Sequence, residues 1–119
     1  MLTERRDYIL RLIQQAGAAA RRLREQLIGE ADSATEVASE ADQEISTLLG
    51  GAAMAPLIER VDAVTAVQLI GDKERIRAWI ELLAVRAQAF VVSGDDANAR
   101  RVVERASALR DAAVHLPSR

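Results

Sequence analysis

Residues 72–109, DKERIRAWIELLAVRAQAFVVSGDDANARRVVERASAL, decide the fold of this chain. Apolar residues recur there at steps of three and four, the period of an α-helix, on both sides of Ser93-Gly94-Asp95. Gly and Asp favour a tight turn, and Asp72 stands where a helix N-cap is expected. The stretch therefore predicts a long helix after Asp72, a turn at 93–95 and a last helix near residues 96–114.

The long helix of this hairpin is apolar over much of its circumference, so we expect it to pack against neighbours on two sides. Its two apolar stripes contain Ile76, Ile80, Leu83, Ala87 and Phe90, and Trp79, Leu82 and Ala89. The inward residues predicted for the last helix are Ala99, Val102, Val103, Ala106, Leu109 and Ala113.

Residues 1–50 predict a second hairpin. Its first helix begins near Thr3, a suitable N-cap, and runs to about Ile28, with Gly29 as its stop. The apolar face of this helix contains Tyr8, Leu12, Ala16, Ala19, Leu23 and Leu27, widened by Ile9 and Ile13.

The second helix of this hairpin has the clearest start signal, because Ser33-Ala34-Thr35-Glu36 has the form of a capping box. Gly50-Gly51 ends the helix. Its predicted inner face contains Ala34, Val37, Ala38, Ala41, Ile45, Leu48 and Leu49.

The segment between the hairpins, residues 52–71, predicts one or two short helices. Ala55-Pro56 suits the first turn of one, and Asp62 suits the N-cap of another that Gly71 closes. The pattern leaves open whether this segment forms a pocket or only a connector.

The fold class predicted by these segments is all-α: antiparallel helical hairpins, with about four main helices and one or two short connecting ones. A chain of 119 residues suits a single domain, here spanning residues 1–119. We expect a first hairpin at 1–50, a connector at 52–71, a second hairpin at 72–114 and a frayed tail at 115–119.

Charge is unevenly distributed along the chain, whose net charge is −2. Residues 1–28 carry six arginines and three acids, whereas residues 29–62 carry eight acids and one arginine. We therefore expect the first two helices to attract each other as an antiparallel pair, although each exposed ion pair contributes at most ~1 kcal/mol. The arginines expected to face the acids are Arg21, Arg22 and Arg24, opposite Asp32, Glu36 and Glu40. With Glu44, these glutamates form a solvated face rather than a carboxylate site.

The composition disfavours several classes of site. Cysteine is absent and the one histidine, His115, lies in the predicted tail, so we predict no metal, cofactor or catalytic site. No apolar run approaches the ~20 residues of a membrane span, and the N-terminus lacks the order of a signal peptide. We expect a cytoplasmic protein with no nucleic-acid or membrane partner.

A cluster of arginines and the one tryptophan are candidates for binding. Arg100, Arg101 and Arg105 could hold an anion, although a solvated helix face explains them more simply. Trp79 fits a core position, with an interface anchor as the other possibility. The residues predicted for a possible interaction surface are Tyr8, Ile9, Leu12, Ile13, Ala16, Trp79, Arg100, Arg101 and Arg105.

Residues 90–106 resemble the end of a tetratricopeptide (TPR) repeat. The matching positions are Phe90, Gly94, Asp95, Ala99, Val103 and Ala106. A weaker copy, 65 residues earlier, has Gly29, Ala34, Ala38 and Ala41 at matching positions but Glu25 in place of Phe90. The whole chain is similar to a family of short bacterial TPR-like proteins of unknown function, whose N-termini resemble residues 7–13, DYILRLI. The resemblance implies a TPR-like fold and implies no activity.

We interpret the chain as a non-catalytic, TPR-like module that binds a partner protein or a second copy of itself. The alternative is a regulatory protein that binds a small ligand or an anion in a pocket between the hairpins, near Trp79 and the short helices. An exposed apolar groove favours the first interpretation, and an enclosed polar-rimmed cavity favours the second.

We predict that the chain forms a homodimer through its first helix. Two hairpins offer few repeats to stack, so the terminal helices leave apolar surface uncovered. Sedimentation equilibrium at micromolar concentration is expected to report twice the mass of one chain. A single species with the mass of one chain would contradict the prediction.

Overall fold

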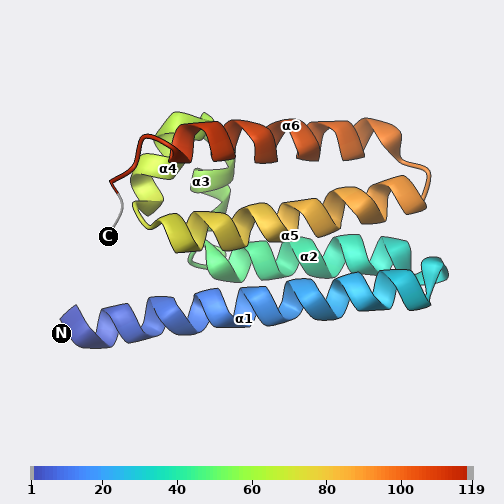
Figure 1. The fold of residues 1–119 in the computed structure, drawn as a ribbon, viewed down its shortest axis with the longest axis horizontal. Helices are drawn as coiled ribbons and strands as arrows, with labels where there is room; N and C mark the ends of the chain where they lie inside the picture. The colour runs from blue at the N-terminus through green and yellow to red at the C-terminus, as the bar shows by residue number, and fades with distance from the viewer. Residues whose placement is uncertain (1, 118–119) are drawn as a thin grey trace.

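Six α-helices and one short 3₁₀ helix follow one another in the computed structural model, which describes residues 2–117 and side chains from Glu4 onward. They are α1 (Leu2–Gly29), η1 (Ala31–Ser33), α2 (Ala34–Leu48), α3 (Ala55–Arg60), α4 (Ala63–Ile70), α5 (Lys73–Val92) and α6 (Asp96–Ala113). Two antiparallel hairpins, α1–α2 and α5–α6, are joined by α3 and α4 (Figure 1). The predicted all-α hairpin fold, with about four main helices and one or two short ones, is confirmed: four long helices and two short ones are observed.

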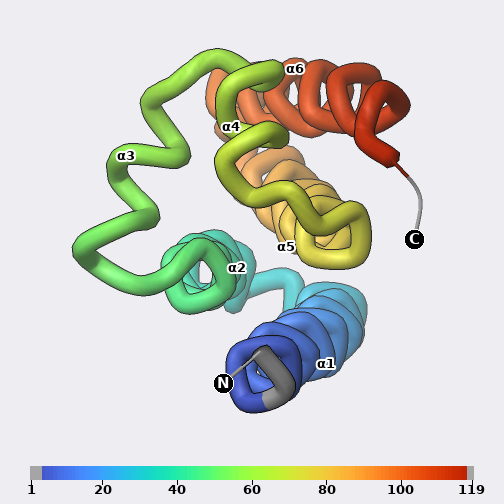
Figure 2. Tube along the Cα trace, turned by 90° about the vertical axis from the view of Figure 1, so that its left-hand side faces the viewer, coloured from blue at the N-terminus to red at the C-terminus, as the bar shows by residue number. Residues whose placement is uncertain are grey.

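Helix α5 lies at the centre of the molecule. It packs against α1 and α2 on one side and against α6 on the other, as the view along the helices shows (Figure 2). The expectation that this helix is covered on two sides is therefore confirmed, and its side chains Trp79, Leu82 and Val85 are buried.

The three aspartates that precede α4, α5 and α6 fix where those helices begin. The Asp72 carboxylate accepts from the backbone N–H of Glu74 and Arg75 at 2.9 and 3.2 Å. Asp62 and Asp95 cap α4 and α6 in the same way. These bonds satisfy backbone donors that the first turn of a helix leaves unpaired.

The capping box predicted for α2 is wrong in its hydrogen bonds, although the helix begins at the predicted place. No side-chain bond caps this helix at Ser33, whose hydroxyl instead donates to the carbonyl of Glu30 at 2.7 Å. The reason is that Ser33 is the last residue of the 3₁₀ helix η1, so its hydroxyl bonds within that turn rather than to α2. The predicted N-cap of α1 lies outside the described side chains, and the helix begins one residue before Thr3.

The core contains most of the residues that periodicity predicted. All seven residues of the predicted inner face of α2 are buried, as are Leu12, Ala16, Ala19, Leu23 and Leu27 of α1. Tyr8, by contrast, is 53% exposed. The N-terminal turns of α1 project past the start of α5 (Figure 1).

Two predictions near the C-terminus are also wrong. Val103 is 56% exposed, because it follows Val102 on α6 and a step of one residue turns it away from α5. Leu116, expected in a frayed tail, packs against the core, and its N–H donates to the carbonyl of Ala113 at 3.1 Å. The last two residues of the predicted tail, 118–119, lie outside the described residues.

A search of the described residues for membrane-spanning segments finds no helix with the length and apolar character to cross a bilayer.

The first hairpin carries the ion pair that its charges predicted. Arg22 Nη1 lies 3.1 Å from Glu40 Oε2, with both side chains largely exposed. Of the pairs expected between α1 and α2, it is the one formed within the described part of the chain. Because an exposed pair contributes only ~0–1 kcal/mol, apolar contacts must supply most of the stability of this hairpin.

We predict that replacing Leu23 by Ala lowers the free energy of unfolding by about 2–5 kcal/mol, because this fully buried side chain leaves a cavity. High salt should change the free energy of unfolding far less than Leu23→Ala does, because salt weakens only the exposed charge pairs, which it screens beyond about 10 Å at 0.1 M. Chemical denaturation at low and high salt, with Arg22→Gln beside Leu23→Ala, measures both effects. A larger loss from salt than from Leu23→Ala would show that charge holds the hairpin together.

Candidate functional site

Two grooves lie along the α5–α6 hairpin, and no residue lines both of them. One lies between the start of α5 and the end of α6, and is called the apolar groove below. The other lies toward the turn between these helices and includes Trp79, so it is called the Trp79 groove. The two therefore occupy different faces and different ends of one helix pair.

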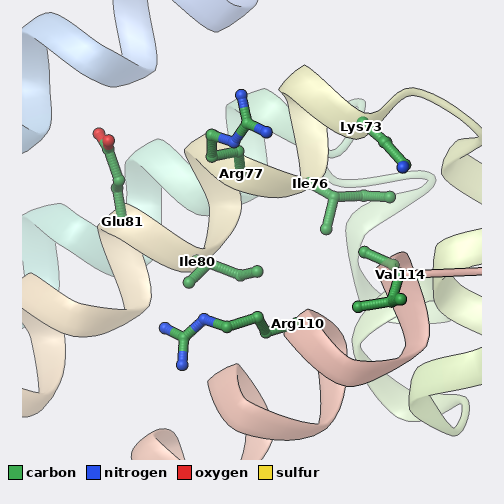
Figure 3. Close-up of a pocket in the computed structure, with 8 residues that line it drawn as sticks. Lys73, Ile76, Arg77, Ile80, Glu81, Arg110 and Val114 are labelled. Carbon is green, nitrogen blue, oxygen red and sulfur yellow. The ribbon is translucent and has the colours of Figure 1, made fainter. Parts of the chain in front are cut away.

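The apolar groove has a volume of about 450 Å³. Its apolar lining is Ile76, Ile80, Ala113 and Val114, and its charged lining is Lys73, Arg77, Glu81 and Arg110. Ile76 and Ile80 lie between the two helices, whereas Arg77 and Glu81 point away from α6 (Figure 3). The groove thus combines an apolar floor with a rim that carries three basic residues and one acid.

The rim of this groove is exposed to solvent. Arg77 Nη1 lies 2.7 Å from Glu74 Oε1 one turn earlier, and both side chains are more than half exposed. An ion pair this exposed is easily exchanged for another, since it contributes little free energy.

The Trp79 groove has a volume of about 370 Å³ and is built by α2, α3, α5 and α6. Its aromatic and apolar lining is Trp79, Leu83, Phe90 and Val102. Its polar lining is Asp42, Glu59, Arg86, Asn98, Arg101 and Arg105. Charges of both signs therefore surround the one tryptophan of the chain.

Two buried nitrogens in the described side chains have no hydrogen-bond partner, and both belong to residues of the Trp79 groove. They are the indole Nε1 of Trp79, a side chain only 1% exposed, and Nε of Arg86. Both are donors. A buried donor without an acceptor costs about 1–3 kcal/mol, and native proteins usually satisfy such groups.

Arg105 joins the connector to the second hairpin at this groove. Its Nη2 donates to the carbonyls of Ile58 and Glu59, in the last turn of α3, at 3.2 and 3.3 Å. Its guanidinium also lies over the Trp79 ring, 5.5 Å from the centroid. A cation at these carbonyls satisfies acceptors that the helix end leaves unpaired.

Arg86 lies beside an aromatic ring and a carboxylate. Its guanidinium is 5.2 Å from the centroid of the Phe90 ring, and its Nη1 is 3.8 Å from Asp42 Oδ1. That distance is too long for a hydrogen bond. Arg86 is therefore held in place by weak contacts while its Nε has no acceptor.

The pKa of the Glu59 carboxyl group is raised by its surroundings in this groove. Partial burial and the charge of Asp42 raise its pKa, and the opposing charges of Arg86 and Arg105 do not fully offset them. Because the pKa is higher in the folded than in the unfolded chain, ionisation of Glu59 opposes folding as the pH rises through that value.

The predicted interaction residues do not form one surface. Leu12, Ala16 and Trp79 are buried in the core, so they are not part of the exposed surface. Ile9 and Ile13 are half-buried. The three predicted arginines do not share one site. Arg101 and Arg105 line the Trp79 groove, whereas the exposed Arg100 lines neither groove.

Sequence reasoning missed most of the groove residues. Arg86 is the residue that could have indicated the Trp79 groove. It shares one helix face with Trp79, Leu83 and Phe90, so it places a cation within an apolar stripe. No local pattern marked Asp42 or Glu59, since the fold brings them to this face from two other helices.

The described residues contain no group of three or more histidine and acidic side chains placed to hold a metal ion. Comparison of the chain with protein-family models, with curated proteins and with solved structures finds no significant match.

We predict that Arg105→Gln lowers the free energy of unfolding by about 1–2 kcal/mol, because two carbonyls of α3 lose a charged donor and Trp79 loses its cover. Chemical denaturation measures the change. Arg101→Gln, on the same helix but exposed, is the matched control and should leave stability within about 0.5 kcal/mol of the wild type. Equal effects of the two variants would contradict the role assigned to Arg105.

Proposed function

We propose that this chain is a non-catalytic, TPR-like interaction module of the cytoplasm, which binds an acidic, amphipathic segment of a partner protein. The observation that carries the proposal is the apolar groove, an open channel between two antiparallel helices with isoleucines on its floor and basic residues on its rim.

The shape of the groove suits a peptide. Helices often bind by laying an apolar face into a groove between two helices of the partner, with anchors at steps of three and four residues. Ile80 is partly exposed on α5 and Val114 is exposed at the end of α6, beside the buried Ile76. Apolar side chains of the bound segment would contact this floor.

The charge of the groove favours an acidic segment. Its lining carries Lys73, Arg77 and Arg110 against one acid, Glu81, and a second acid, Glu74, pairs with Arg77 beside it, so the bases still exceed the acids by one. Complementary charge at an interface rim speeds association and rejects partners of the wrong sign. A segment with acidic residues on both sides of its apolar anchors meets both requirements.

The second hairpin supports the TPR-like part of the proposal. Gly94 adopts a positive φ of 85° at the turn, and Ala99 and Ala106 are buried where α6 meets α5. Small residues at those positions permit close helix packing, which is the physical basis of the resemblance.

Selection from a displayed random-peptide library tests the proposal. We expect the selected peptides to be rich in Asp and Glu beside Leu, Ile or Phe. The variant Arg110→Glu should bind these peptides about 10-fold more weakly, because it reverses one charge on the rim. Exchanging a peptide Glu for Lys should restore part of that loss.

Arg100→Glu provides the matched control, because Arg100 is exposed on α6 but lines neither groove. It should bind the peptides as the wild type does. A library that yields no enriched peptide, or peptides that bind wild type and Arg110→Glu equally, would overturn the proposal. Equal weakening by both variants would place the binding surface on the outer face of α6 instead.

A further inference from the structure

The turn between α1 and α2 exposes an isoleucine to water. Ile28, in the last turn of α1, is 82% exposed, a larger fraction than for any other large apolar side chain of the described residues. A single exposed isoleucine is common on protein surfaces. The residues around it therefore decide whether it has a partner.

The neighbours of Ile28 in the sequence are acidic. Residues 25–32, EQLIGEAD, contain no base and are called the acidic tip below. The arginines of α1 lie at least one turn before Ile28, and one of them, Arg22, is already paired with Glu40. The carbonyl end of α1 adds partial negative charge at the tip. The acids of the tip, all exposed, are Glu25, Glu30 and Asp32.

The apolar groove has the complementary properties. Partly exposed Ile80 and exposed Val114 offer it aliphatic surface, and its bases exceed the nearby acids by one. The proposed function calls for a segment with acids on both sides of an apolar anchor. The acidic tip has that order, with Glu25 before Ile28 and Glu30 after it.

We propose that the acidic tip of one copy of this chain occupies the apolar groove of a second copy. Ile28 of the first copy covers Ile80 and Val114 of the second, and the carboxylates of Glu30 and Asp32 lie beside its basic rim. This inference rests on the proposed function, because it names a second copy of the chain as the partner of that groove.

The tip and the groove lie at opposite ends of the molecule. The turn between α1 and α2 is at one end of the long axis, and the start of α5 and the end of α6 are at the other (Figure 1). The molecule extends 44 Å along this axis, so one copy cannot place its tip in its own groove. The contact must therefore join two copies through two different surfaces.

The contact is expected to be weak. Interfaces that bury less than about 1,200 Å² are typical of transient complexes, and a turn with one large apolar side chain belongs to this class. Association should therefore appear between high micromolar and millimolar concentrations.

Sedimentation velocity of the full chain over this range tests the proposal. The weight-average sedimentation coefficient of the wild type should rise with concentration. Ile28→Ser should weaken the association about 10-fold or more, because the burial of an isoleucine is lost. Val103→Ser is the matched control, since it removes an exposed aliphatic side chain that lines neither groove. It should associate as the wild type does.

Two defective variants should complement each other. Ile28→Ser has an altered tip and an intact groove, whereas Arg110→Glu has an intact tip and an altered groove. Each should associate more weakly than the wild type when alone. An equimolar mixture should associate more strongly than either variant, because the tip of one fits the groove of the other. A contact between two identical surfaces would not recover in this way.

The proposal fails if the wild type stays monomeric at millimolar concentration, or if Ile28→Ser and Val103→Ser associate alike. It also fails if mixing Ile28→Ser with Arg110→Glu restores no association. Binding of the selected peptides to Ile28→Ser reports on the groove separately, because this variant keeps the groove intact. Peptides that bind this variant, while wild-type copies do not associate, would remove this inference and leave the proposed function standing.

Discussion

The structure depends on the burial of α5 on two opposite sides. Ile76, Trp79, Leu82 and Val85 are all within 1% of full burial, between the first hairpin and α6. A helix enclosed in this way has only narrow sectors left for charged residues. Arg77 and Glu81 occupy one such sector and Arg86 another, and these sectors border the two grooves. The positions of the grooves thus follow from how the central helix is covered.

Two arginine side chains satisfy the ends of helices α2 and α3 and join them to neighbouring helices. Arg75 Nε donates to the carbonyl of Leu48, at the end of α2, at 2.8 Å, and Arg105 does the same for α3. Each bond fixes where a helix stops and which neighbour lies beside it. By placing Glu59 beside α5 and α6, the second bond makes α3 a wall of the Trp79 groove. The connector is therefore also part of a potential site.

Periodicity and helix caps were sufficient to predict the helices, because each depends on residues close in sequence. Asp62, Asp72 and Asp95 cap the helices they precede, and the apolar steps of α2 and α5 identify most of the core. The prediction for Tyr8 was wrong because periodicity places a residue on a helix face but does not tell how far the neighbouring helix extends. The Trp79 groove could not be predicted for a related reason. Its residues Asp42, Glu59 and Arg86 belong to three helices, and only packing brings them together.

The linings of the two grooves cost the folded chain free energy in different ways. The apolar groove leaves aliphatic surface in contact with water, and that cost is spread evenly and can be relieved by many side chains of about the right size. Beside the Trp79 groove the cost lies in two buried donors, Trp79 Nε1 and Arg86 Nε, each of which costs about 1–3 kcal/mol while unpaired. That cost is directional, because only an acceptor at a defined position relieves it, whereas any contact that covers aliphatic surface relieves the first.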